Sequence, residues 1–204
     1  MDRSAHWNSV YTTMHEHDVS WFEALPAVSL RMLEASELTT ASCVIDVGGG
    51  DSRLVDHLVA RGLRCVTVLD VSSAALQRAR ERLGDAAAVP RWIEADVTGT
   101  WSSDPVNIWH DRAVFHFLTE AAERERYRSH LERVLAPGGF AVMATFALEG
   151  PERCSGLPVA RYSPESLQEE LGPAFELIES EPWAHSTPWG ASQAFQYSRF
   201  RHAR

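Results

Sequence analysis

The chain has 204 residues, of which 45% are hydrophobic and 23% are charged, a composition typical of one globular domain. Its 28 acidic residues outnumber its 19 basic residues, which gives a net charge of −9 with histidine neutral. This negative charge argues against general binding to nucleic acid or to an anionic membrane. No window is long and apolar enough to predict a membrane span, so we expect a cytoplasmic protein.

The first forty residues are rich in aromatic residues and histidine. Apolar residues at helical spacing from Trp21 to Leu38 predict one or two helices that cover the core. We expect a single domain over residues 1–204, with residues 1–40 as a helical lid and residues 41–204 as the core. His15 and His17 are two residues apart and so do not share a helix face, and no metal site is expected.

From Ser42 onward, predicted strands and helices alternate. Short apolar or alternating runs predict the strands, which are CVIDV, RCVTVLD, RWIEAD, VNIWH, FAVMATF, FELIESEPW and SQAFQYSRFRH. Amphipathic segments with capping residues predict the helices, which are DSRLVDHLVARG, SSAALQRARERLG, EAAERERYRSHLERVLAPGG and SPESLQEELG. Five alternations of strand and helix favour an α/β fold with a doubly wound, mostly parallel sheet. In this sheet the last two strands are expected to form an antiparallel pair.

The three cysteines are an odd number and show no CxxC spacing. Cys43 and Cys65 stand in apolar runs, which predicts two buried thiols and favours a reducing compartment.

The first predicted strand ends in a glycine-rich turn, and ligands of such sheets bind beyond the carboxyl ends of the strands. A dinucleotide fingerprint starting at Gly48 would need a glycine where Arg53 stands. The pattern [DE]xGxGx[GS] is satisfied instead, by Asp46, Gly48, Gly50 and Ser52. It suits S-adenosylmethionine, because a carboxylate can serve the ammonium group while bare glycine backbone approaches the methionine moiety.

Two more carboxylates follow predicted strands. Asp70 ends the second strand, where an acid can accept from both ribose hydroxyls. Asp96 ends the third strand, where it can accept from an adenine amino group while the N–H of Val97 donates to the ring. The alternative is that both aspartates only cap the segments that follow them.

The segments VIDVGGGDS, VTVLDVSSAALQRAR, EADV and LERVLAPGGFAVMATF resemble the class I S-adenosylmethionine-dependent methyltransferases over about residues 42–150. The resemblance implies a Rossmann-like sheet of seven strands in the order 3-2-1-4-5-7-6, with strand 7 antiparallel. It implies S-adenosylmethionine as the cofactor. The predicted cofactor-binding residues are Asp46, Gly48, Gly49, Gly50, Asp70, Val71, Asp96, Val97, His110 and Trp21.

The segment after the fourth strand, WHDRAVFHFL, lacks the [DN]PP[YF] signature of amino-methylating relatives. It resembles the WDRG-type segment of thiopurine and plant thiol methyltransferases, and it is also similar to the DKGT-type segment of protein-lysine methyltransferases. Asp111 and His116 are the candidate catalytic residues. The alternative is that Asp111 pairs with Arg112 to hold the turn and that His116 is a core histidine.

The Gly/Pro-rich segment LEGPERCSGLPVARYSPESL resembles the loop that covers a small acceptor in the thiol and thiopurine methyltransferases. We therefore expect methyl transfer to a small molecule, with a preference for a thiol or related chalcogen. Methylation of a protein lysine is the alternative, and a non-catalytic S-adenosylmethionine-binding module is the remote one. The sequence does not predict the oligomeric state.

Overall fold

The computed structural model describes residues 2–203. Its main sheet has seven strands, which are β1 (Cys43–Val47), β2 (Cys65–Asp70), β3 (Arg91–Glu94), β4 (Val106–Arg112), β5 (Leu135–Phe146), β8 (Phe175–Ser186) and β9 (Ser192–His202). A separate hairpin pairs β6 (Arg153–Cys154) with β7 (Leu157–Pro158). The helices are α1 (Arg3–Thr13), α2 (Ala27–Ala35), α3 (Leu54–Ala60), α4 (Ser73–Leu83), α5 (Ala121–Val134) and α6 (Pro164–Leu171).

The strand order of the main sheet is β3-β2-β1-β4-β5-β9-β8. The first five strands pair in parallel, whereas β9 runs antiparallel to both β5 and β8. With β8 and β9 counted as the sixth and seventh strands of this sheet, the predicted order 3-2-1-4-5-7-6 and the antiparallel seventh strand are confirmed.

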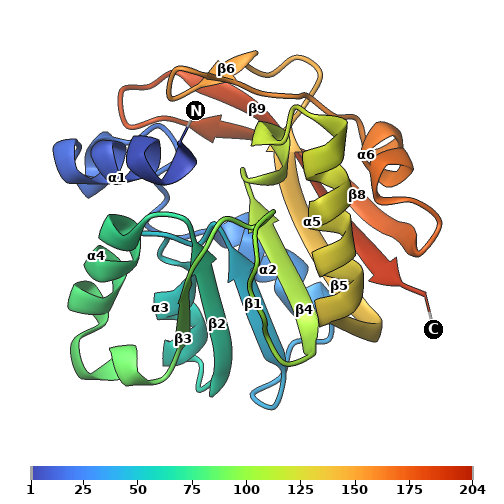
Figure 1. The fold of residues 1–204 in the computed structure, drawn as a ribbon, viewed down its shortest axis with the longest axis horizontal. Helices are drawn as coiled ribbons and strands as arrows, with labels where there is room; N and C mark the ends of the chain where they lie inside the picture. Colours follow the sequence, from blue (N-terminus) through green and yellow to red (C-terminus); the bar gives the residue numbers. More distant parts are fainter. Residues whose placement is uncertain (1, 204) are drawn as a thin grey trace.

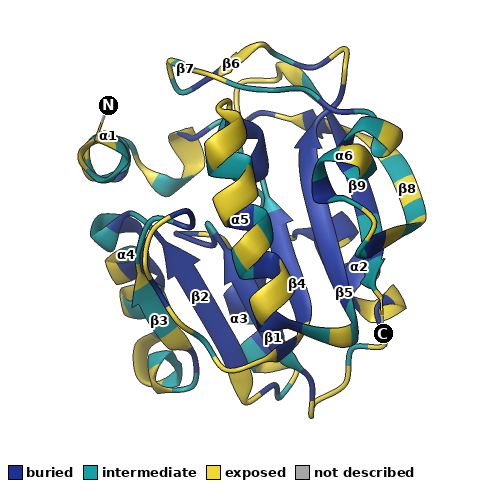
Figure 2. Ribbon diagram, turned by 45° about the vertical axis from the view of Figure 1, so that its right-hand side comes forward, coloured by how far each residue is buried: buried dark blue, intermediate teal, exposed yellow. Residues whose placement is uncertain are grey.

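Helices cover both faces of the sheet, and the central strands are the most deeply buried elements (Figures 1 and 2). One core cluster packs α2, α3 and α4 against one face, and a second packs α5 and α6 against the other. The helix α1 lies apart from both layers, beside α4 at the carboxyl end of the parallel strands (Figure 1). None of the helices within residues 2–203 is long and apolar enough to cross a membrane.

Local sequence signals determine where helices α4 and α2 begin and where α4 ends. The hydroxyl of Ser72 accepts a hydrogen bond from the N–H of Ala75 at the start of α4, and Gly84 follows its end with φ of +56°. Helix α2 is shorter than the apolar spacing from Trp21 predicts. It begins after Pro26, because a proline disfavours helical backbone in the residue before it.

The prediction of two buried thiols at Cys43 and Cys65 is wrong. The two residues are partners in the parallel register of β1 and β2, each at the first position of its strand, and a disulfide joins them. Cys43 is half-buried and Cys65 is exposed, because the apolar runs begin at the rim of the sheet. The reducing compartment inferred from these cysteines loses its support, and the cytoplasmic location stays a prediction.

Replacing Leu131 by alanine should destabilise the fold by about 2–5 kcal/mol, because its side chain is fully buried between α5 and the sheet and its loss leaves a cavity. Urea denaturation measures the free energy of unfolding. Leu148→Ala is the matched control, since Leu148 is 54% exposed and should change stability by less than about 0.5 kcal/mol. Equal effects of the two variants would contradict this packing.

Candidate functional site

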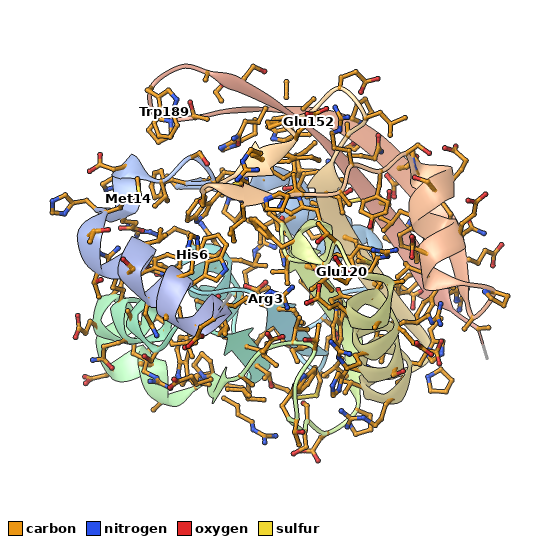
Figure 3. All side chains as sticks on the ribbon, turned by 45° about the horizontal axis from the view of Figure 1, so that its top comes forward. Arg3, His6, Met14, Glu120, Glu152 and Trp189 are labelled. Carbon is orange, nitrogen blue, oxygen red and sulfur yellow. A yellow bond between two sulfur atoms is a disulfide. The ribbon has the colours of Figure 1, made fainter. Side chains whose placement is uncertain are left out.

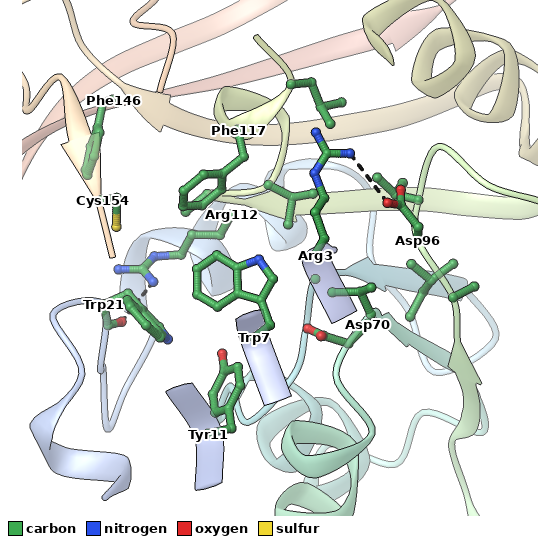
Figure 4. A pocket seen from close by; sticks show the side chains of 18 of the residues that line it. Arg3, Trp7, Tyr11, Trp21, Asp70, Asp96, Arg112, Phe117, Phe146 and Cys154 are labelled. Carbon is green, nitrogen blue, oxygen red and sulfur yellow. Dashed lines mark hydrogen bonds and ion pairs between the residues drawn. The ribbon is translucent and has the colours of Figure 1, made fainter. Parts of the chain in front are cut away.

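A cavity of about 850 Å³, including its open mouth, lies at the carboxyl ends of the parallel strands (Figure 4). Two ends of the cavity differ in chemistry. The carboxylate end is lined by Arg3, Gly48, Leu69, Asp70, Val71, Ala95, Asp96 and Val97. The aromatic end is lined by Trp21, Arg112, Phe117, Phe146, Cys154, Gln193 and Phe195. Trp7 and Tyr11 of α1 lie between the two ends.

The turn after β1 has no room for side chains. Gly48 has φ of +64°, and a Cβ atom there would lie 1.9 Å from Cγ2 of Val114. Gly50 has φ of +43°, and a Cβ atom there would lie 2.8 Å from Oδ2 of Asp70. The backbone N–H of Gly48 donates to the carbonyl of Leu69 at 2.7 Å, which holds the turn against β2. The turn therefore presents bare backbone to the cavity.

Asp46 lies beneath this turn, in a buried polar chain. Its Oδ1 is 2.7 Å from Nδ1 of His110, and Nε2 of His110 is 2.9 Å from the hydroxyl of Ser29 on α2. Its Oδ2 lies 2.6 Å from where a Cβ of Gly49 would stand. Within residues 2–203 this oxygen has no hydrogen-bond partner, so one buried acceptor remains for a cationic group.

Asp70 lines the carboxylate end. Burial raises the pKa of Asp70 from 3.8 to about 7, although the N–H of Ser72, which donates to its Oδ1 at 2.8 Å, acts in the opposite direction. Its side chain thus caps the segment that leads into α4 and also lines the cavity.

Asp96 likewise caps the segment that follows its strand and lines the cavity. Its Oδ1 accepts from both the N–H and the hydroxyl of Thr98 at 2.7 Å, and its Oδ2 lies 3.4 Å from Nη1 of Arg3. Burial alone would raise the pKa of Asp96, but Thr98 and Arg3 outweigh it and hold the pKa below its usual value. Asp96 is therefore an ionised carboxylate at neutral pH.

Helix α1 closes the top of the cavity, with Arg3 at the end nearest α5 (Figure 3). Arg3 donates to Glu123 of α5 at 2.7 Å. On the α4 side, Oδ1 of Asn8 accepts from the hydroxyl of Ser72 at 2.9 Å and from the N–H of Ala74 at 3.1 Å. These contacts connect α1 to both sides of the cavity opening.

Both candidate catalytic residues are fully buried, and neither lines the cavity. Asp111 accepts from the hydroxyl of Tyr127 at 2.6 Å and from the N–H of Val114 at 2.9 Å, and burial raises its pKa to about 6. Nδ1 of His116 accepts from the N–H of Phe146 at 3.3 Å, and burial lowers the pKa of His116 to about 3. A base role for either residue stays a prediction that this placement does not support.

Arg112 does not pair with Asp111. Its Nη2 lies 3.2 Å from Oε1 of Glu23, while Nε donates to the hydroxyl of Tyr197 at 3.1 Å and Nη1 to the carbonyl of Trp21 at 2.9 Å. The two side chains diverge because adjacent residues of a strand point to opposite faces of the sheet.

The structure brings six of the ten predicted cofactor-binding residues to the cavity wall, which are Trp21, Gly48, Asp70, Val71, Asp96 and Val97. Asp46, Gly49 and Gly50 form the turn behind that wall. His110 lies beneath it and lines a smaller second cavity. Sequence reasoning missed Arg3, Gln193 and Phe195, because only the folded chain brings α1 and β9 to this edge of the sheet.

The segment of His15 to Asp18 forms no metal cluster. Glu16 accepts from Nη2 of Arg53 at 2.8 Å, and the ring of His17 packs edge-on against Phe22 with centroids 4.4 Å apart. Across residues 2–203, no three histidine, cysteine or acidic side chains gather closely enough to hold a metal ion.

Residues 44–139 match the family model described as a methyltransferase domain. Uncharacterized methyltransferases of Mycobacterium bovis and Mycobacterium tuberculosis are each 32% identical to this chain over 116 residues. The aligned part is 56% of this chain and 56% of each relative, so the match spans about half the length of these curated relatives.

Two solved structures share the fold over nearly the whole chain. One, from work on the conversion of a disulfide bond into a thioacetal group during echinomycin biosynthesis, has a TM-score of 0.78 at 18% identity and covers 98% of this chain and 91% of that one. The other is the 1,6-didemethyltoxoflavin-N1-methyltransferase of Burkholderia thailandensis with bound 1,6-didemethyltoxoflavin and S-adenosylhomocysteine. It has a TM-score of 0.70 at 17% identity and covers 98% of this chain and 84% of that one. These likenesses establish the fold.

The raised pKa of Asp70, about 7 against 3.8, predicts a pH-dependent stability. The folded protein keeps a proton on Asp70 that the unfolded chain releases, so this stabilisation is complete at low pH and is lost as the pH rises through about 7. Asp70→Asn removes the titration, so its stability should rise relative to that of the unmodified chain between about pH 5 and pH 8. Urea denaturation at both pH values measures the difference.

Asp104→Asn is the control for this comparison, because Asp104 is exposed. Its difference in stability from the unmodified chain should stay constant with pH. A constant difference for Asp70→Asn as well would contradict a buried, titrating Asp70.

Proposed function

We propose that this chain, whose residues 44–139 match the methyltransferase-domain model, is a class I S-adenosylmethionine-dependent methyltransferase that transfers a methyl group from S-adenosylmethionine to a small thiol. The observation that carries the choice of acceptor is the chemistry of the aromatic end. Within the described chain, the residues that line this end include no aspartate, glutamate or histidine. A thiol needs no strong base, since part of it is already thiolate near neutral pH.

The carboxylate end fits S-adenosylmethionine. The unpartnered Oδ2 of Asp46 suits the ammonium group, and the bare turn at Gly48 leaves room for the methionine moiety. Asp70 is placed to accept from the ribose hydroxyls, and Asp96 to accept from the adenine amino group. When bound, S-adenosylmethionine supplies a methyl group activated by a sulfonium sulfur. The chain itself holds and orients the two reactants, which accounts for most of the catalysis that displacement at carbon needs.

Residues 1–40 act in this proposal as a lid on the core of residues 41–204. The ring of Trp7 lies 5.2 Å from Phe117 and 5.7 Å from Trp21, centroid to centroid, which forms an aromatic wall over the middle of the cavity. Such rings attract a cation and exclude water. The polar contacts of Arg3 and Asn8 hold α1 in this closed position.

Asp111 and His116 lie behind the cavity wall and support it. The two oxygens of Asp111 hold the N–H groups of the turn at Val114 and the hydroxyl of Tyr127. His116 packs against Phe146 with ring centroids 4.6 Å apart. We assign both residues to positioning the walls of the cavity. The structure from work on the thioacetal group of echinomycin and the Burkholderia enzyme with bound 1,6-didemethyltoxoflavin support a small-molecule acceptor on this fold.

Replacing Asp70 by alanine should weaken the binding of S-adenosylhomocysteine by about 1.5–3 kcal/mol, roughly 10- to 150-fold, because hydrogen bonds to a carboxylate are lost. Isothermal titration calorimetry measures the dissociation constant, and Asp104→Ala on the surface is the control. An unchanged affinity of Asp70→Ala would remove Asp70 from the cofactor site.

A coupled assay of S-adenosylhomocysteine release, run over thiols, phenols, amines and lysine-containing proteins, tests the acceptor. We expect turnover with small thiols and none with proteins. Turnover with a protein lysine and no thiol would replace this function by the alternative one. Tight cofactor binding without turnover on any acceptor would leave a binding module.

A further inference from the structure

We propose that the rings of Trp7, Tyr11 and Trp21 form an aromatic cage for the sulfonium group of the methyl donor, so that the site prefers S-adenosylmethionine to its product S-adenosylhomocysteine. The inference rests on the proposed cofactor and does not depend on the acceptor. All three side chains line the cavity, and Figure 4 shows them grouped around its middle. All three also belong to residues 1–40, the segment proposed as a lid.

The three rings lie close to one another. The ring centroids of Trp7 and Trp21 are 5.7 Å apart, those of Tyr11 and Trp21 are 6.1 Å apart, and those of Trp7 and Tyr11 are 6.4 Å apart. A cation is attracted to an aromatic ring when it lies within about 6 Å of the ring centroid. Because the three centroids form a nearly equilateral triangle of this size, one cation in the cavity can meet that distance to all three rings.

The cage lies beside the residue proposed to bind the ribose. A Cβ atom on Gly50 would lie 2.8 Å from Oδ2 of Asp70 and 3.2 Å from the hydroxyl oxygen of Tyr11, so these two side chains converge on the same turn. In S-adenosylmethionine a single methylene group joins the ribose ring to the sulfonium sulfur. A ribose bound by Asp70 therefore brings the sulfonium group close to Tyr11, between the carboxylate end and the aromatic end of the cavity.

No arginine of the described chain occupies the faces of these three rings. The cation–π contacts within residues 2–203 involve other rings, those of Trp92, Phe195, Trp101 and Phe140. The two arginines that line the cavity have carboxylate partners of their own. Arg3 pairs with Asp96 and Glu123, and Arg112 pairs with Glu23. The ring faces of the cage are therefore available to a cationic ligand.

The surroundings of the cage strengthen its attraction for a cation. Phe117 packs edge-on against Trp7, with centroids 5.2 Å apart, and Tyr11 is only 7% exposed, so little water reaches the rings. Burial and the charge of Asp70 raise the pKa of Tyr11 far above its usual value, which keeps its ring a neutral phenol. Cation–π attraction is stronger at such desolvated sites than at exposed ones.

This cage distinguishes the donor from the product by charge. S-adenosylmethionine carries a positive sulfonium group where S-adenosylhomocysteine has a neutral thioether. The adenine, ribose and amino-acid groups are the same in both ligands, so contacts with Asp96, Asp70 and Asp46 discriminate far less between them. Since the rings belong to residues 1–40, loss of the positive charge on methyl transfer weakens the contact of this segment with the ligand and favours release of the product.

The test compares the binding of three ligands by isothermal titration calorimetry. They are S-adenosylmethionine, S-adenosylhomocysteine and an analogue in which a carbon bearing a primary amine, protonated at neutral pH, replaces the methylated sulfonium. The two cationic ligands should bind to the unmodified chain about tenfold or more tightly than S-adenosylhomocysteine. In Trp7→Leu and in Trp21→Leu this preference should fall by about 3- to 30-fold, the range for one desolvated cation–π contact. Lost packing weakens all three ligands alike and cancels in the ratio.

Three further variants separate the ring from the rest of the side chain. Trp7→Phe and Tyr11→Phe keep an aromatic face and should retain most of the preference. Trp92→Leu is the matched control, because Trp92 is also a half-buried tryptophan but lies outside the cavity wall, with Arg80 already 5.2 Å from its ring centre. It should leave the preference unchanged.

Far-UV circular dichroism shows whether each variant folds. If Trp7→Leu does not fold, the preference of the unmodified chain and of Trp21→Leu decides the question. Equal affinity of the unmodified chain for donor and product, or an unchanged preference in both leucine variants, would overturn the cage and leave the proposed methyl transfer in place. Failure of S-adenosylmethionine and S-adenosylhomocysteine to bind to the unmodified chain would overturn the proposed cofactor together with this inference.

Discussion

The parallel register between β1 and β4 determines which polar side chains of these two central strands share a face of the sheet. In that register Asp46 lies opposite His110, and Val47 lies opposite Asp111. Because side chains alternate between the faces of a sheet, His110 and Arg112 point to the α2 side, and Asp111 points to the α5 side. The chain Asp46–His110–Ser29 then forms on one face, and the contact of Asp111 with Tyr127 forms on the other. A shift of one residue would exchange the two sets.

The same register accounts for what the sequence could and could not predict. Strand and helix periodicity sufficed for a doubly wound, mostly parallel sheet, because continuous apolar runs alternating with amphipathic helices allow few other topologies. The strand order itself followed from the resemblance to the methyltransferases. The bare turn at Gly48 was predictable as well, since its spacing is local. The hydrogen-bond partners of Asp111 were not predictable, because Tyr127 and the neighbouring segments approach Asp111 only through tertiary packing. The pairing of Cys43 with Cys65 likewise depends on strand register, which no local pattern reveals.

The N-terminal segment proposed as a lid shows the same limit of sequence-based prediction. Aromatic residues near the N-terminus predicted a cover, but the polar contacts that hold it come from Arg3 and Asn8, whose partners lie far along the chain. Asn8 reaches the start of α4, 64 to 66 positions further along the chain. There its side chain accepts from a backbone N–H that α4 cannot satisfy internally. Helix α1 thus binds polar groups that a helix start leaves without a partner, at the edge where the cofactor is proposed to bind.

The distribution of charge along the cavity connects the two proposed ligands. The carboxylate end carries Asp70 and Asp96 with Asp46 beneath, whereas the charged residue that lines the aromatic end is Arg112, which is paired with Glu23 at 3.2 Å. The carboxylate end therefore favours a cationic methyl donor. In the proposed transfer, the positive charge of the sulfonium and the negative charge of the thiolate disappear together. S-adenosylhomocysteine then keeps its ammonium group but lacks the sulfonium charge, so its attraction to the carboxylate end is weaker than that of S-adenosylmethionine.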